Sequence, residues 1–175
     1  MHSSLIAWIM RAIPFGTIIM YGALGETVTE KSGNLNLGVP GIMYLGGFAG
    51  FASAWAYENS AANPNGFVSI LIALSCAILA SMAGGLIYAF LTISLRANQN
   101  VTGLALTIFG IGLSAFIGQH YVSYSLPGLQ PVAIPLLADI PVLGPILFKH
   151  DVVVYLSFIA FALVAWTLAK TRLGL

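Results

Sequence analysis

Long apolar segments separated by short polar stretches dominate this chain. Charged residues are absent from the runs 32–57, 59–95 and 97–138. A helix needs about 20 mainly apolar residues to cross the hydrocarbon layer of a membrane. Five segments reach that length, at about 5–25, 36–57, 67–95, 101–119 and 152–169. The pattern predicts an all-α, polytopic transmembrane helix bundle of about five spans, forming a single domain over residues 1–175.

Proline and glycine positions modify this picture at two places. Gly38, Pro40 and Gly41 stand at the head of the second segment and predict a broken second helix. The connection 120–151 cannot form one continuous helix, because it holds five of the eight prolines: Pro127, Pro131, Pro135, Pro141 and Pro145. We expect a loop there, with short interfacial or re-entrant pieces, between spans four and five.

Composition excludes several classes of protein. Hydrophobic residues make up 59% of the chain and charged residues 6%, against about 25% charged in soluble domains. A net charge of +1 without clustered Lys or Arg argues against nucleic acid as a partner. The chain has no G-x-x-x-x-G-K-[ST] phosphate loop and no metal-ligand spacing among its histidines and Cys76. We therefore expect a membrane protein with lipid around it, no cofactor, no metal, and any ATP hydrolysis on a separate chain.

The basic residues beside the spans predict the orientation. No Lys or Arg precedes the first apolar stretch, which we interpret as a retained span rather than a cleaved signal. If the chain crosses the membrane five times, one side of the membrane holds four basic residues: Lys31, Arg96, Lys170 and Arg172. Since positive charge favours the cytoplasmic side, an external N-terminus is predicted.

Small residues recur at the spacing that lets helices approach closely in lipid. These candidate packing positions are Gly46, Gly50, Ser81, Gly85, Gly110, Ser114 and Gly118. The spelling G-x-G-x-x-A at 110–115 lies inside an apolar run and has no acidic residue at the required distance, so it indicates helix packing rather than dinucleotide binding. An intramembrane serine hydrolase is a rival hypothesis, but Ser114 and His120 are about 120° out of angular register on a helix.

Two polar clusters are candidates for a solute path. The first places amides at the head of the second segment, and the second separates spans three and four; their members are Asn34, Asn36, Asn98, Gln99, Asn100 and Thr102. Both clusters are also compatible with ordinary solvated loops. Polar groups at membrane depth are tolerated beside protein or water, and interrupted helices are typical places for transporters to bind substrate.

Three ordered blocks resemble a known family. GETVTEKSGNLNLGVPGIMYLGG is similar to the "ERSG-N-G-EG-M" signature of permease subunits of bacterial ABC importers in the branched-chain amino acid and simple-sugar group. NQNVTGLALTIFGIGLSAFIG resembles the following "NQ-V-G-ALT-G-G-S" block, and ADIPVLGPILF, YLSF and TRLGL resemble the block that ends the next helix. The likeness is greatest to nucleoside or simple-sugar permeases. Pro40 stands where an acidic residue is usual, which argues against a carboxylate role there.

The resemblance implies a permease component that moves a small polar solute, a nucleoside or a simple sugar, across the bacterial inner membrane as a multi-pass protein and not as an enzyme. It also implies cytoplasmic ATPase subunits, a second permease subunit and an extracellular substrate-binding lipoprotein as partners. In such permeases a coupling loop and later spans follow the TRLGL-like residues. We accordingly expect this chain to correspond to the N-terminal portion. A structural or assembly subunit without transport is the alternative.

Overall fold

The computed structural model describes the chain apart from Met1, Pro127, Ile134, Leu136, Asp139, Val142 and residues 172–175. Arg172 of the orientation argument, and most of the TRLGL block, therefore lie outside the described residues. The chain forms two compact units, one of residues 1–31 with 128–175 and one of residues 32–127. Long helices make up most of both units, which confirms the prediction of an all-α, polytopic fold. The single domain over residues 1–175 stays a prediction.

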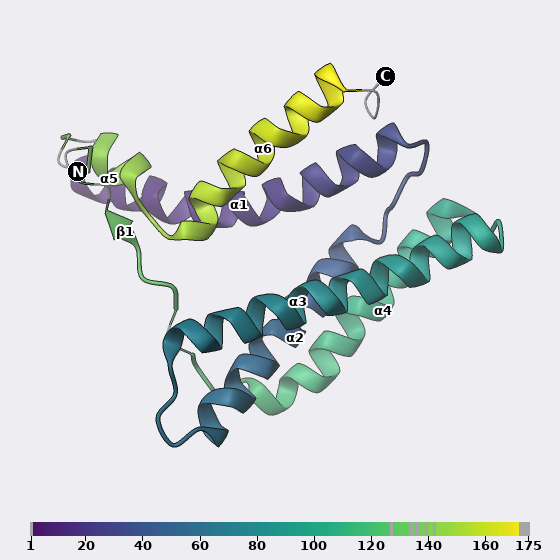
Figure 1. Cartoon of the computed structure of the whole chain (residues 1–175), viewed down its shortest axis with the longest axis horizontal. Coiled ribbons are helices and arrows are strands. Elements are labelled where there is room, and N and C mark those ends of the chain that lie inside the picture. The colour runs from purple at the N-terminus through teal and green to yellow at the C-terminus, as the bar shows by residue number, and fades with distance from the viewer. Residues whose placement is uncertain are drawn as a thin grey trace. The chain divides into compact units, whose positions relative to one another are not determined.

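The first unit pairs the two ends of the chain. Helix α1 (His2–Lys31) packs against α6 (Val152–Lys170) and against the short α5 (Leu143–Phe148) (Figure 1). The Tyr21 hydroxyl donates a hydrogen bond of 3.0 Å to the Val153 carbonyl oxygen. Asp151 caps α6, because its carboxylate accepts from the Val154 amide at 3.0 Å.

Helix α1 extends six residues beyond the predicted end of the first span, which was placed at about residue 25. Residues 26–31 are helical, and two of their polar side chains bond carbonyl groups of the same helix. The hydroxyls of Thr27 and Thr29 donate to the carbonyls of Ala23 and Gly25, four residues back. The helix ends before Gly33, whose φ of +85° is the left-handed conformation that glycine adopts at helix C-termini.

The second unit is built from three long helices in succession. Helix α2 (Val39–Ser60) packs against both α3 (Gly66–Ala89) and α4 (Gln99–Gly118) (Figure 1). A π-helical turn, η1 (Phe90–Ser94), extends α3, and a 3₁₀ turn, η2 (Gln119–Tyr121), extends α4. The predicted third span, 67–95, thus corresponds to a continuous helical segment of 29 residues, Gly66–Ser94.

The expectation of a broken second helix is wrong in its detail. Helix α2 is continuous over 22 residues, and Pro40 lies in its first turn. A first-turn proline lacks an N–H that would be unpaired in any case, and its fixed φ suits a helix start. Gly38 and Pro40 therefore mark where the helix begins instead of interrupting it.

Four helical segments among the described residues have the length and composition of membrane spans: Ile6–Lys31, Gly66–Ser94, Gln99–Tyr121 and Val152–Lys170. Helix α2 is long enough to cross but does not meet the same apolar criterion. It packs against two neighbouring helices, and helices buried by protein have less need of a lipid-like surface. That α2 is a fifth crossing stays a prediction.

The proline-rich connection contains short elements, as predicted. Strand β1 (Val132–Ala133) pairs antiparallel with β2 (Lys149–His150), with Val132 opposite His150. Helix α5 precedes β2 and includes Pro145.

The small residues predicted to pack helices fall into two groups. A Cβ at Gly46 would clash with Ser81, and one at Gly50 would lie 2.9 Å from the Ala73 carbonyl oxygen, so both glycines adjoin α3. On α4, a Cβ at Gly110 would clash with the Gly41 backbone. Around Gly85 and Gly118, no described atom lies within 4 Å of an added Cβ. Close approach of α2 to its two neighbours therefore depends on Gly41, Gly46, Gly50 and Gly110.

Candidate functional site

The candidate site lies where the loop 32–38 meets the start of α4. The Gln99 side chain bonds two parts of this loop: its Nε2 donates to Asn34 Oδ1 at 3.0 Å, and its Oε1 accepts from the Leu35 amide at 3.0 Å. Both side chains, Asn34 and Gln99, are half-buried. Two residues that belong to different predicted clusters are thus brought together across 65 positions of sequence.

Two hydroxyl groups hold the carbonyl side of the same loop. Tyr88, buried near the end of α3, donates to the Leu35 carbonyl at 2.7 Å. Thr107 of α4 donates to the Leu37 carbonyl at 2.6 Å. We refer to Asn34, Leu35, Leu37, Tyr88, Gln99 and Thr107 as the polar seam. The seam supplies hydrogen-bond partners to a non-helical backbone segment that a membrane would otherwise leave unpaired.

One face of α4 is shaped to receive this loop. A Cβ at Gly103 would lie 2.8 Å from the Leu37 nitrogen and 2.9 Å from the Gly38 nitrogen. Gln99, Gly103, Thr107 and Gly110 follow each other at three- or four-residue steps, which places them on a single helix face. The loop and the first turn of α2 therefore lie along α4 in close backbone contact.

Asn36 and Asn98 both hydrogen-bond backbone amides near helix starts. Asn36 is buried, and its Oδ1 accepts from the Gly38 amide at 2.9 Å, just before α2. Asn98 is the N-cap of α4 and accepts from the amides of Asn100 and Val101 at 3.0 and 3.2 Å. An asparagine at this position satisfies helix N–H groups that have no partner within the helix.

Asn100 and Thr102 are the predicted site residues whose side chains form no hydrogen bond within the part of the chain that the structure describes. Asn100 is exposed and Thr102 is half-buried. The Asn34 amide nitrogen likewise has no bond to a described residue, since its oxygen alone meets Gln99. Together these groups offer donors and acceptors of the kind that hydroxylated solutes recognise.

The serine hydrolase hypothesis gains no support from the geometry. Ser114 Oγ is buried and forms no hydrogen bond with any described residue. His120 is exposed in the 3₁₀ turn that follows α4. A nucleophile needs a base within hydrogen-bond reach, and this pair does not provide one.

Sequence reasoning missed Tyr88 and Thr107 in the seam, because each lies within an apolar helix. It also missed an aromatic cluster at the far end of the same three helices. Tyr121 contacts Trp55 edge-to-face with ring centroids 5.1 Å apart, and the Tyr124 ring centroid lies 4.8 Å from that of Trp55. Aromatic side chains at the ends of spans are typical of the membrane–water interface. The position of these aromatic residues next to predicted span ends could therefore have indicated the cluster from sequence.

In comparison with known proteins, residues 8–175 of this chain match the family of branched-chain amino acid transport system permease components. A guanosine ABC transporter permease protein of Bacillus subtilis is 35% identical over 161 residues, which is 87% of this chain and 49% of the relative. A Haloferax volcanii protein, provisionally named as a glucose ABC transporter permease, is 32% identical over 91% of this chain and 46% of its own length. A nucleoside ABC transporter permease protein of Lactococcus lactis is 29% identical over 92% of this chain and 51% of its own length.

The chain spans about half the length of these relatives. No solved structure matches it significantly. The family model nevertheless covers nearly all of the sequence, including both blocks that form the polar seam. Together with the spans described above, this match establishes a multi-pass membrane protein that belongs to the family of branched-chain amino acid transport system permease components.

Proposed function

We propose that this chain forms part of the permease of an ATP-driven importer that carries a small polar solute, a nucleoside or a simple sugar. The observation that carries the proposal is the family match over residues 8–175. Relatives named for guanosine, nucleoside and glucose transport support the solute class. These solutes share a hydroxylated ring, so one set of amide and hydroxyl partners can serve them all.

Within that function, the open groups beside the polar seam are the proposed path lining. Asn100, Thr102 and the Asn34 amide nitrogen lie at one end of the three-helix unit and can exchange hydrogen bonds with a passing solute. Gln99, Asn36 and Asn98 play a supporting part, because their oxygens are already occupied by the protein's own donors. The path therefore depends on a rigid backbone platform with a few adaptable polar groups at its edge.

The proposed partners follow from the family. Cytoplasmic ATPase subunits would supply the energy, a second permease subunit would complete the path, and an extracellular binding lipoprotein would deliver the solute. Hydrolysis of ATP is assigned to the separate subunits, so this chain is proposed to have no enzymatic activity of its own.

A second candidate is a structural or assembly subunit that does not line a path. The specific observation in its favour is that most polar groups of the seam bond to the chain itself, notably Gln99 with Asn34 and Tyr88 with Leu35. On this hypothesis the amides serve only to fold the loop 32–38. The two candidates differ in what they predict for Asn100 and Thr102.

The experiment changes the two open side chains and measures uptake. Asn100→Leu and Thr102→Val remove hydrogen-bonding groups that no described residue uses, so the permease should reach the membrane in normal amounts. Cells that express the whole permease with its partners are given labelled guanosine or glucose, and uptake is divided by permease abundance. A several-fold loss per molecule supports path lining.

Two controls complete the design. Thr27→Val removes a hydroxyl that bonds only its own helix and should leave uptake unchanged. The binding protein's affinity for the solute is measured separately, to exclude an effect before the membrane step. Normal uptake by the Asn100→Leu/Thr102→Val double variant would favour the structural candidate. Absence of uptake of either solute by the unaltered permease would refute the proposed solute class.

A further inference from the structure

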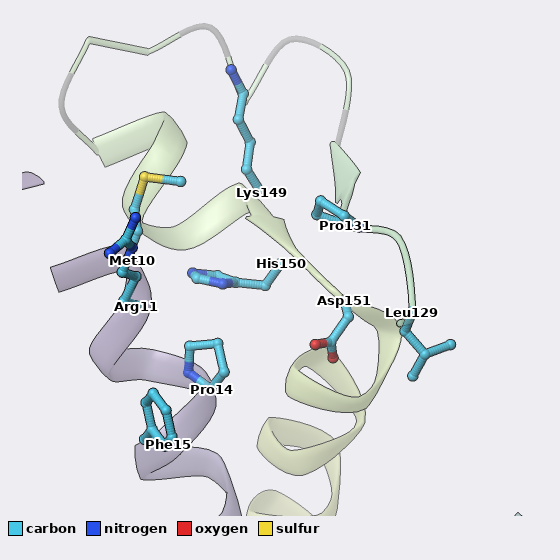
Figure 2. Close-up of a pocket in the computed structure, with 9 residues that line it drawn as sticks. All are labelled: Met10, Arg11, Pro14, Phe15, Leu129, Pro131, Lys149, His150 and Asp151. Carbon is cyan, nitrogen blue, oxygen red and sulfur yellow. The ribbon is translucent and has the colours of Figure 1, made fainter. Parts of the chain in front are cut away.

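The hollow in the first unit does not bring its two cations together. It has a volume of about 440 Å³ and lies between the N-terminal half of α1 and the segment 149–151. Figure 2 shows the Lys149 side chain directed away from α1, where Arg11 lies. A surface of the second unit, on α2, instead combines several features that suit a ligand.

Four aromatic side chains form a ladder along one face of α2. They recur at steps of four, three and four residues, which places them on a single helix face. The members of this aromatic ladder are Tyr44, Phe48, Phe51 and Trp55. The last three contact the ring of Tyr121, with ring centroids 5.7, 6.1 and 5.1 Å apart. Their side chains therefore point to the same side of α2, and Tyr44 stands one turn before them.

Tyr44 lies close to mid-depth of the neighbouring spans. Two nearby residues of α2, Ile42 and Gly46, adjoin Gly84 and Ser81 of α3 respectively. Tyr44 is therefore level with the central part of the 29-residue segment that α3 and η1 form. The hydrocarbon layer is about 30 Å thick, so a tyrosine side chain at this depth cannot extend to either surface.

The Tyr44 hydroxyl has no protein partner at that depth. The residue is 55% exposed, and it forms no hydrogen bond with any residue that the structure describes. A hydroxyl in hydrocarbon without a hydrogen bond costs free energy, and tyrosines that face lipid gather at the membrane–water interface. Helix α2 also misses the apolar criterion that the other long helices among the described residues meet. The surface around Tyr44 therefore suits water or a polar ligand better than acyl chains.

The chemistry of the ladder matches a solute with an aromatic base. Nucleobases stack on aromatic side chains through their π faces, and a tyrosine adds a hydroxyl that donates or accepts a hydrogen bond. Room for such a ring is available beside the ladder. Gly47 is exposed, and no described atom lies within 4 Å of a Cβ added there. At the outer end, the Tyr124 ring centroid lies 4.8 Å from that of Trp55, and Tyr124 is 50% exposed.

We propose that the aromatic ladder receives the base of a nucleoside and guides it from Trp55 to Tyr44 at mid-depth. The proposal rests on the permease function proposed above and narrows its solute class. The external N-terminus predicted from the basic residues puts Trp55 on the side from which an importer takes its solute. Stacking accepts every base because each has a π face, so one ladder serves several nucleosides. The Tyr44 hydroxyl exchanges a hydrogen bond with the passing solute.

The first test measures whether water and a nucleoside reach Tyr44. Single cysteines replace Tyr44 and two controls, Met82 and Ile108, in the Cys76→Ala background of the whole permease, in membrane fragments open on both sides. The controls are exposed apolar residues of α3 and α4 near the same depth. A small charged methanethiosulfonate reacts only with thiols in contact with water. We expect it to modify the Tyr44→Cys variant and neither control, and guanosine but not glucose should slow that modification severalfold.

The second test measures uptake of labelled guanosine per permease molecule in cells that express the whole permease with its partners. Loss of a stacked ring weakens base binding about fivefold or more. We expect at least that loss of uptake for Tyr44→Leu and a smaller loss for Tyr44→Phe, which retains the ring. Gly47→Leu fills the open space beside the ladder and should also reduce uptake. Gly112→Leu fills equally open space on α4 and should leave uptake unchanged.

The proposal requires both results. A Tyr44→Cys variant that is not modified, or whose modification guanosine does not slow, would overturn it, because protein or lipid would then cover this face. Uptake by Tyr44→Leu equal to that of wild type at equal abundance would overturn it as well. Protection by glucose alone would refute the nucleoside assignment but leave the proposed permease function intact. Absence of uptake of either solute by the unaltered permease would refute that function and this proposal with it.

Discussion

The change Gln99→Leu tests whether the polar seam holds the loop 32–38. Leucine has nearly the same size as glutamine but can neither donate to Asn34 nor accept from the Leu35 amide. Both bonds are 3.0 Å long, and both partners are at least partly buried. The variant therefore removes two contacts that join the loop to α4 while leaving the helix itself intact.

The loss of stability follows from the groups that lose their partners. A typical hydrogen bond contributes about 1 kcal/mol net, and a buried donor left without a partner costs about 1–3 kcal/mol. For Gln99→Leu, the unpaired Leu35 amide and the lost Asn34 contact together cost about 2–4 kcal/mol. In a chain of 175 residues, this corresponds to a fall in Tm of roughly 5–10 °C.

Thermal unfolding of the detergent-solubilised chain measures this fall, and hydrogen exchange of the peptide that contains residues 32–38 localises it. Asn100→Leu is the matched control. It also replaces an amide by leucine in the first turn of α4, but the Asn100 side chain forms no hydrogen bond with the described residues. We expect the control to shift stability by less than about 0.5 kcal/mol. Equal Tm and equal exchange for Gln99→Leu and wild type would refute a holding role for the seam.

Two further predictions concern helix packing and orientation. Gly110→Ala should lower the free energy of unfolding by about 1–3 kcal/mol, because the added Cβ would overlap the Gly41 backbone. The control Gly112→Ala, where no described atom lies within 4 Å of an added Cβ, should be neutral or slightly stabilising. Equal effects of the two substitutions in thermal unfolding would contradict this prediction. In a Cys76→Ala background, a cysteine at Asn63 should react with an impermeant thiol reagent on intact cells and one at Asn100 should not; the reverse pattern would overturn the predicted external N-terminus.

The sequence predicts the long elements of this fold well. All five predicted segments correspond to helices whose ends differ from the prediction by a few residues at most, except at the C-terminal end of α1. Runs of apolar residues that long have few other stable conformations in lipid. The error at α1 has a local cause: Thr27 and Thr29 look like loop residues by type, but on a helix their hydroxyls bond carbonyls one turn back.

Which small residues pack helices is less readable from spacing. Gly46 and Gly85 each belong to a pair of small residues spaced four apart, with Gly50 and Ser81 respectively. An added Cβ nevertheless clashes at Gly46 and meets no described atom at Gly85. The motif gives the helix face, whereas the crossing geometry of the neighbouring helix decides which part of that face is in contact. That geometry depends on side chains far away in the sequence.

The two asparagine clusters show why a polar residue beside a span has two meanings. A loop that enters a helix bundle must satisfy its backbone N–H and C=O groups, and amide side chains are suited to that task. A solute path requires the same amides for the same chemical reason. Residue type therefore cannot separate the two uses, but the bonds can: Gln99 and Asn36 already serve the backbone. Groups that the fold leaves open, such as the Asn100 side chain, are where a transport role becomes measurable.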